Sequence, residues 1–139
     1  MFKGLRTPTP PAPRVVLIVD DEEPIRLAAR RILEAGGYKV LEAENGARAL
    51  EMATDDVTVD LLMADLEMPE LAGEEMARRL RAARRDLKVL YVSGYVDRLL
   101  NERPMLWDGE AFLEKPFTFE SLSEAVSLLL FGTLKPPAA

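Results

Sequence analysis

The segment VVLIVDDEE, residues 15–23, decides how the rest of the sequence is interpreted. It begins with an unbroken apolar run of strand length, whereas a strand with one solvated face would alternate apolar and polar residues. A continuous run is typical of a strand covered on both faces, as in a parallel sheet between helices. Acidic residues follow the run at once. We therefore expect a buried strand whose carboxyl end presents a cluster of carboxylates.

Further strand-length runs follow along the chain, and amphipathic stretches alternate with them. The runs cover residues 38–43, 59–64, 88–92 and 111–113. Repeated alternation of strand and helix predicts an α/β fold, in which right-handed crossovers build a doubly wound, five-stranded parallel sheet with helices on both faces.

The helical stretches show apolar residues three and four positions apart, which lays one apolar stripe on a sheet. Pro24 suits a first helical turn, Gly36-Gly37 suits a helix stop, and Thr118 or Ser121 suits an N-cap. The stripes expected on the first and last helices are Ile25, Ala28, Ala29 and Ile32, and Leu122, Ala125, Val126 and Leu129.

Proline marks both ends of the chain and resists regular structure there. Residues 1–13 contain four prolines, and the chain closes with KPPAA at residues 135–139. A length of 139 residues fits one domain. We expect a proline-rich tail over residues 1–13, one folded domain over 14–131 and a C-terminal tail over 132–139.

The composition excludes several kinds of chemistry. The chain has no cysteine and no histidine, so disulfides, thiolate zinc sites, thiol nucleophiles and a histidine base are all ruled out. A net charge of -6 argues against nucleic acid or anionic lipid as a direct partner. No apolar run approaches the ~20 residues of a membrane span, and no signal peptide is evident, so we expect a cytoplasmic protein without direct membrane contact.

Polar residues follow the apolar runs at the points where the predicted strands end. In a parallel α/β sheet these points share one edge, where ligands bind. Unit charges ~4 Å apart repel by about 4 kcal/mol at an effective dielectric of ~20, so clustered carboxylates there need a cation. Oxygen ligands without histidine or cysteine favour Mg²⁺. The residues expected at this edge are Asp20, Asp21, Asp65, Ser93 and Lys115.

In this arrangement the sequence resembles the receiver domain of response regulators, the CheY-like family of two-component systems. The resemblance covers about residues 14–131. It is carried by the acidic pair Asp20-Asp21, by DLEMPELAG at residues 65–73, by Ser93-Gly94 and by Lys115-Pro116-Phe117. It implies a flavodoxin-like sheet in the order 2-1-3-4-5 with five helices, and a phosphoacceptor role in signal transduction.

The resemblance also implies a role for each site residue. Asp65 would accept a phosphoryl group from a histidine kinase or phosphotransfer protein. Asp21 and Asp65 would ligate Mg²⁺ directly, Asp20 through water, and Glu67 through its backbone carbonyl. Lys115, which precedes a cis proline in the family, would contact a phosphoryl oxygen.

The switch implied by the resemblance comprises Ser93 and Phe112. Ser93 would give its hydroxyl to a phosphoryl oxygen and move inward, after which Phe112 would rotate into the vacated space. The Tyr95 and Glu67 side chains occupy positions that influence phosphoryl loss in the family, and we hypothesise that they hinder attacking water.

The region after Ser93 departs from the family pattern. Pro104 and the turn at Trp107-Asp108-Gly109 predict a short or frayed fourth helix. The segment YVSGY at residues 91–95 is similar to the corresponding segment in receiver domains of hybrid sensor histidine kinases. We expect the chain to act through a partner, or to be a module of such a kinase, because no output domain follows residue 131.

Two alternatives remain open at this point. One is a Mg²⁺-dependent phosphohydrolase, which also forms an aspartyl phosphate but carries a second aspartate two residues after its nucleophile, where this chain has Glu67. The other is a degenerate receiver that serves only as a binding scaffold. The favoured reading is a phosphoacceptor signalling domain, not an enzyme, with only self-phosphorylation and slow self-dephosphorylation.

Overall fold

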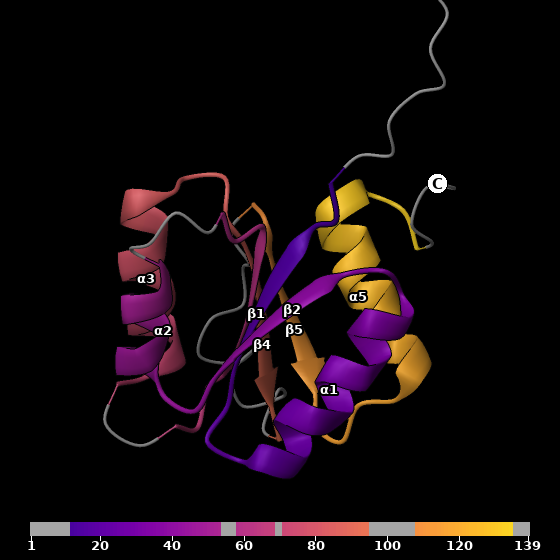
Figure 1. The fold of residues 1–139 in the computed structure, drawn as a ribbon, viewed down its shortest axis with the longest axis horizontal. Coiled ribbons are helices and arrows are strands. Elements are labelled where there is room, and N and C mark those ends of the chain that lie inside the picture. Colours follow the sequence, from indigo (N-terminus) through magenta and orange to yellow (C-terminus); the bar gives the residue numbers. More distant parts are fainter. Residues whose placement is uncertain (1–11, 54–57, 69–70, 95–107, 135–139) are drawn as a thin grey trace, which may run out of the picture.

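The computed structural model describes residues 12–53, 58–68, 71–94 and 108–134. They form one parallel sheet of five strands in the order β2-β1-β3-β4-β5 (Figure 1), which confirms the predicted order. In chain order the elements are β1 (Val15–Val19), α1 (Glu23–Ala35), β2 (Lys39–Ala43), α2 (Gly46–Ala53), β3 (Leu61–Asp65), α3 (Gly73–Ala83), β4 (Lys88–Ser93), β5 (Glu110–Glu114) and α5 (Phe119–Phe131).

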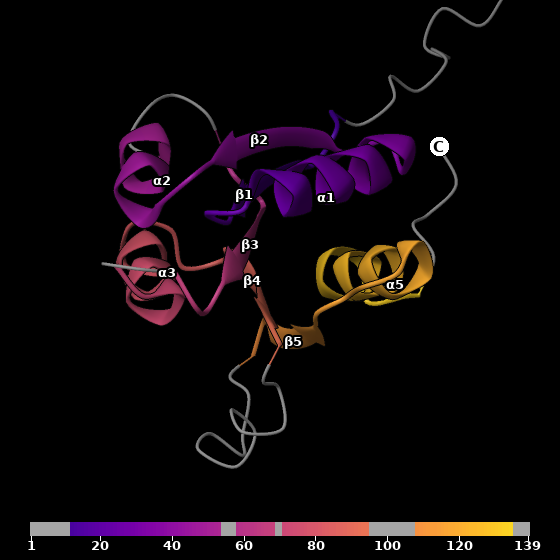
Figure 2. The same ribbon diagram turned by 90° about the horizontal axis from the view of Figure 1, so that it is seen from below.

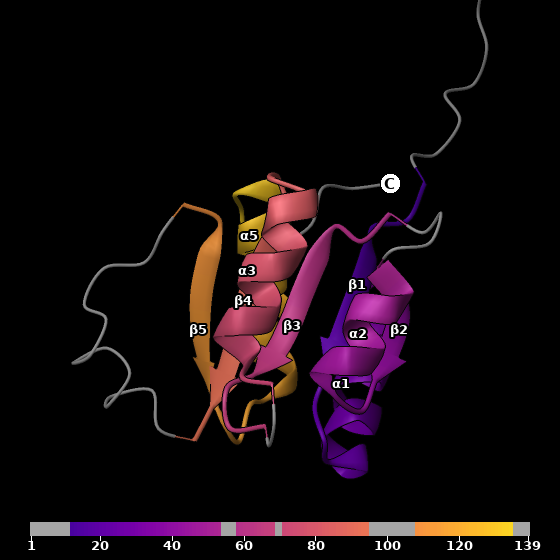
Figure 3. The ribbon, with the colours of Figure 1, turned by 90° about the vertical axis from the view of Figure 1, so that its left-hand side faces the viewer.

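Helices cover both faces of the sheet. Seen along the sheet, α1 and α5 lie on one side, and α2 and α3 lie on the other (Figure 2). In Figure 3, α2 and α3 stand in front of the strands. Within the described ranges, no helix has the length and apolar character needed to cross a membrane.

The side-chain alternation of the strands divides the core into two layers. In β1, Leu17 and Val19 pack toward α2 and α3, whereas Val16 and Ile18 pack toward α1 and α5. All four are fully buried, and burying an aliphatic side chain contributes roughly 1.5–3 kcal/mol. The continuous apolar run at residues 15–19 therefore reflects a strand that faces a helix layer on each side.

The ends of the helices follow the predicted signals. Pro24 lies in the first turn of α1, and Gly36 caps its end. Thr118 caps α5 by accepting the Ser121 backbone N–H, while the Ser121 side chain accepts the Thr118 N–H. The predicted stripe of α5 is confirmed, but in α1 the expected Ala28 is exposed and Leu33 is buried in its place.

The strand boundaries differ slightly from the prediction. The run at 59–64 becomes a strand only from Leu61 and includes Asp65, and the short run at 111–113 extends to Glu110–Glu114. Pairing with β4 causes this extension, because Val89 registers with Glu110 and backbone hydrogen bonds do not require apolar side chains. The predicted fourth helix falls on residues 95–107, which lie outside the described residues.

Gly73 allows a close approach of α3 to the end of β3. A Cβ atom added at Gly73 would lie 2.6 Å from the backbone oxygen of Asp65. Because this neighbour is backbone at the end of a buried strand, it has little freedom to move. The start of α3 is thus seated directly against the turn that follows β3.

We predict that Gly73→Ala destabilises the fold by about 1–3 kcal/mol, the usual cost of overpacking. Urea unfolding measures this loss. Gly94→Ala is the matched control, because a Cβ atom at Gly94 meets nothing within 4 Å. Equal stability of the two variants would contradict the close approach.

Candidate functional site at the carboxyl edge of the sheet

The parallel register brings the predicted polar residues to one edge. Asp65 is the last residue of β3 and registers with Val92, while Ser93 ends β4. The Lys115 N–H donates to the Ser93 carbonyl oxygen at 2.8 Å, which fixes the start of the loop after β5 beside β4. Asp20 directly follows β1, whose Val19 registers with Ala64 of β3. Residues separated by up to 95 positions therefore become neighbours through backbone pairing.

Lys115 is the central cation of the site. Its Nζ lies 2.9 Å from Asp20 Oδ2 and 3.4 Å from Asp65 Oδ2. It also lies 3.4 Å from Glu22 Oε2. The Lys115–Pro116 peptide bond is cis, as the family resemblance implied. One ammonium group thus contacts two carboxylates that follow β1 and the carboxylate that ends β3.

The carboxylates form a compact oxygen cluster. Ligand oxygens of Asp20, Asp21, Glu22 and Asp65 all lie within 4.8 Å of one another. Asp20 and Asp65 are buried, whereas Asp21 and Glu22 are exposed. The predicted acidic residues therefore come together, and Glu22 joins them although it was not among the predicted ligands. The acidic run at residues 20–23 contained the signal for it.

Backbone amides orient both buried carboxylates. Asp20 Oδ1 accepts the N–H of Glu22 at 2.9 Å. Asp65 Oδ1 accepts the N–H of Glu67 at 3.0 Å. Each hydrogen bond joins an aspartate to the residue two positions later, so the turn at the end of each strand holds the aspartate side chain in place. The other oxygen, Oδ2, faces Lys115 in both aspartates.

Burial controls the protonation of this cluster. Desolvation raises the pKa of Asp20 and of Asp65 above the ordinary carboxyl value, although backbone hydrogen bonds and Lys115 act in the opposite direction. Desolvation alone would lower the pKa of Lys115, but its contacts with Asp20 and Asp65 raise it overall. The ammonium group therefore stays charged, and the two carboxylates remain incompletely compensated.

Ser93 and Glu67 form a second contact at this edge. The Ser93 side chain is buried, and its hydroxyl donates a short hydrogen bond to the Glu67 carboxylate. Glu67 is an exposed residue, so its side chain reaches inward from the surface. From the sequence we expect its backbone carbonyl to bind a metal ion and its side chain to hinder water, but the sequence does not predict the contact with Ser93.

Phe112 lies next to the site along the sheet. It registers with Tyr91 of β4, two residues before Ser93, and the two rings are 5.5 Å apart. The Tyr91 hydroxyl donates to Glu110 Oε2 at 2.9 Å. Arg81 of α3 pairs with the same carboxylate at 3.6 Å. The ring of Phe112 therefore packs against a side chain that is itself held by α3 and β5.

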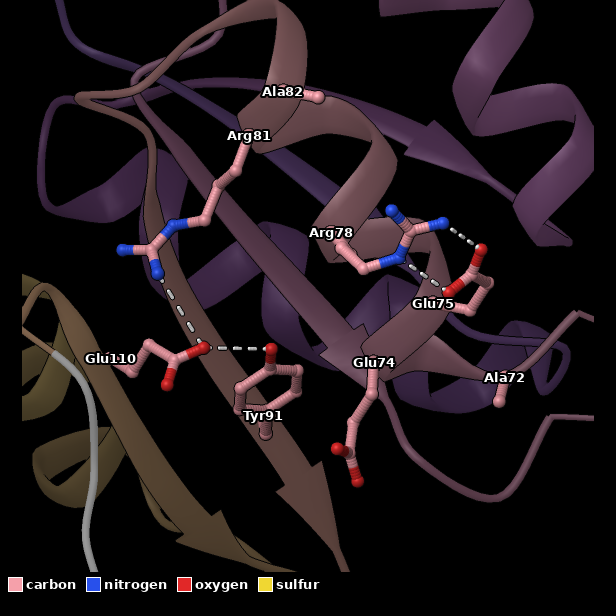
Figure 4. A pocket seen from close by; sticks show the side chains of 8 residues that line it. All are labelled: Ala72, Glu74, Glu75, Arg78, Arg81, Ala82, Tyr91 and Glu110. Carbon is pink, nitrogen blue, oxygen red and sulfur yellow. Dashed lines mark hydrogen bonds and ion pairs between the residues drawn. The ribbon is translucent and has the colours of Figure 1, made fainter.

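Tyr91, Glu110 and Arg81 also line a pocket of about 680 Å³ (Figure 4). The figure shows Arg78 paired with Glu75 along α3, and Arg81 extended toward Glu110 and Tyr91. Arg78 and Arg79 thus make ion pairs within α3, whereas Arg81 connects α3 to β5. None of the predicted metal or phosphoryl residues lines this pocket. It is formed by Ala72, Glu74, Glu75, Arg78, Arg81, Ala82, Tyr91 and Glu110.

Comparison with known proteins agrees with the fold. Residues 16–127 match the family described as response regulator receiver domain. The sensor kinase CckA of Brucella abortus is 37% identical over 117 residues, which is 83% of this chain and 12% of the relative. The chain therefore spans only a small part of that protein.

Solved structures show the same likeness. The receiver domain of the hybrid histidine kinase CckA has a TM-score of 0.71 and 35% identity, and the match covers 84% of this chain and 98% of that one. The response regulator TrrA of Thermotoga maritima, solved with Mg²⁺ and a beryllium fluoride, has a TM-score of 0.71 and 33% identity over 84% of this chain and 99% of that one. With the family match covering most of its length, the chain belongs to the response regulator receiver domains of two-component systems.

Proposed function

We propose that this receiver domain accepts a phosphoryl group on Asp65 from a phosphohistidine of a histidine kinase or phosphotransfer protein. The observation that carries the proposal is the environment of the Asp65 carboxylate. It is buried at the end of β3, one oxygen is held by a backbone amide, and the other lies 3.4 Å from Lys115 Nζ. A fixed carboxylate beside a fixed cation suits attack on an anionic donor.

The transfer is a displacement at phosphorus. An Asp65 oxygen forms the new O–P bond while the P–N bond to the donor imidazole breaks, and the imidazole leaves with the electron pair of that bond. A proton taken up by the imidazole completes the balance. The product on Asp65 is an acyl phosphate, which hydrolyses slowly, so the domain is a signalling element without steady turnover.

The donor set fits Mg²⁺. Carboxylate oxygens without nitrogen or sulfur ligands are what a hard divalent ion prefers, and the two exposed acidic residues leave room for water. Asp21 and Asp65 would bind the ion directly, Asp20 through water, and Glu67 through its backbone carbonyl. Mg²⁺ would neutralise charge on the phosphoryl oxygens during transfer.

Lys115 and Ser93 would bind the phosphoryl oxygens. Lys115 Nζ already lies within 3.4 Å of Asp65, and Ser93 ends the adjacent strand. Engagement of Ser93 would draw its hydroxyl toward Asp65, and Phe112 would respond through the neighbouring strand. A shift from 1:99 to 99:1 needs about 5.5 kcal/mol, so the serine and lysine contacts must act together.

The relatives named as CckA support a setting in a hybrid sensor kinase. In that setting the domain, which we place at residues 14–131, receives its phosphoryl group from the kinase or passes it to a phosphotransfer protein. The TrrA structure supports Mg²⁺ and a phosphoryl mimic as ligands, because beryllium fluoride imitates an acyl phosphate.

We predict that acetyl phosphate with Mg²⁺ adds one phosphoryl group to the protein, and that Asp65→Asn abolishes the addition because the amide is a poor nucleophile. Intact-protein mass spectrometry measures the product. Asp86→Asn, which removes an exposed carboxylate before β4, serves as the control and should be phosphorylated normally. Unchanged phosphorylation of Asp65→Asn, or steady hydrolysis of a phosphomonoester, would contradict the proposal.

The effect of Asp65 on the stability of the fold should depend on pH and on bound metal. The pKa of Asp65 is raised in the folded protein, so its contribution to stability is fully present when it is protonated and is lost as pH rises through that raised pKa. At pH 7 without metal, Asp65→Asn should raise the melting temperature by a few degrees, equivalent to about 1 kcal/mol. The gain should shrink toward about pH 4, the ordinary aspartate pKa.

Thermal unfolding in EDTA and in Mg²⁺ tests both parts of this prediction. Mg²⁺ should stabilise the wild-type protein more than Asp65→Asn, because the ion binds the native cluster. Asp86→Asn again provides the matched control. A destabilised Asp65→Asn protein at pH 7 in EDTA would show that the carboxylate is already fully compensated.

A further inference from the structure

The Glu67 carboxylate contacts the groups that a phosphoryl group would need. It accepts the hydrogen bond of the Ser93 hydroxyl. The pKa of Asp65 is raised mainly by burial, and the Glu67 side chain raises it further. An exposed side chain therefore places an anionic oxygen against both the acceptor carboxylate and the buried serine.

The chemistry of Ser93 makes this contact exclusive. A serine hydroxyl carries one proton, so it donates to one acceptor at a time. A phosphoryl oxygen and the Glu67 carboxylate are both anionic acceptors, and hydrogen bonds to charged groups are worth about 1.5–3 kcal/mol. The incoming phosphoryl oxygen must therefore replace the Glu67 carboxylate as the acceptor of the Ser93 hydroxyl.

We infer that the Glu67 side chain is an internal competitor of the phosphoryl group for the Ser93 hydroxyl, and that it must release Ser93 before the domain can switch. This inference rests on the proposed phosphoacceptor function and adds a second role for Glu67, distinct from its backbone carbonyl. Glu67 acts here through its side chain as a positioning residue for Ser93.

Binding of beryllofluoride with Mg²⁺ measures the competition without any covalent step. Glu67→Ala should bind the mimic roughly tenfold more tightly than wild type, because a charge-assisted hydrogen bond no longer has to break. In a Ser93→Ala background the same change should have a clearly smaller effect, since only the removal of a negative charge remains. The difference between the two effects isolates the Glu67–Ser93 contact.

Glu44→Ala is the control for charge. Glu44 is exposed and directly follows β2, so its removal takes one negative charge from the same edge of the sheet. It should tighten binding much less than Glu67→Ala. An equal gain from Glu44→Ala and Glu67→Ala, or an equal effect of Glu67→Ala with and without Ser93, would overturn the inference.

NMR of the unliganded protein tests the contact itself. The Ser93 amide signal should shift in Glu67→Ala and stay in place in Glu44→Ala, and an unmoved signal in both would overturn the inference. Failure of the wild-type protein to bind beryllofluoride in Mg²⁺ would overturn both the phosphoacceptor function and the competition. Normal wild-type binding with no gain in Glu67→Ala would overturn the competition alone.

Discussion

The site depends on two carboxylates that are buried beside one ammonium group. Asp20 directly follows β1, Asp65 ends the neighbouring strand β3, and Lys115 Nζ contacts both. Burial removes solvent from both carboxylates and raises their pKa values, to which neighbouring carboxylates add, while contacts with the two aspartates raise the pKa of Lys115. One cation compensates them in part. The remaining negative charge favours a divalent cation, and in the proposed function that cation and Lys115 together would offset the charge of a phosphoryl group.

The parallel sheet imposes this arrangement. Its strands all end at the same edge, and the pairing of β1 with β3 and of β3 with β4 fixes which residues become neighbours. A core on each face holds the strands rigidly, so the aspartates cannot separate to relieve their repulsion. At this edge the surrounding fold therefore stabilises an arrangement of charges that is unfavourable by itself.

The Ser93–Glu67 contact lies between the same edge and the proposed switch residues. Ser93 ends β4, and Phe112 of β5 packs on Tyr91 of that strand. Tyr91 is in turn held by Glu110 and, through it, by Arg81 of α3. A movement of Ser93 would therefore begin in β4, where the Tyr91 side chain is connected to α3 through Glu110 and Arg81. This connects the proposed chemistry to the α3 face as well as to β5.

The strand order 2-1-3-4-5 was expected only from the resemblance to the receiver family. The sequence by itself determined the parallel α/β architecture, the acidic and lysine residues of the edge, and an N-cap for α5 at Thr118 or Ser121. These features depend on local patterns: unbroken apolar runs, polar residues at their ends, and turn chemistry. Only the tertiary structure decided that Glu22 joins the cluster, that Glu67 turns toward Ser93, and that β5 includes Glu110. The first two depend on which side chains the sheet brings close to a distant residue, and the third depends on backbone pairing with β4. Such long-range pairing has no periodicity along the chain.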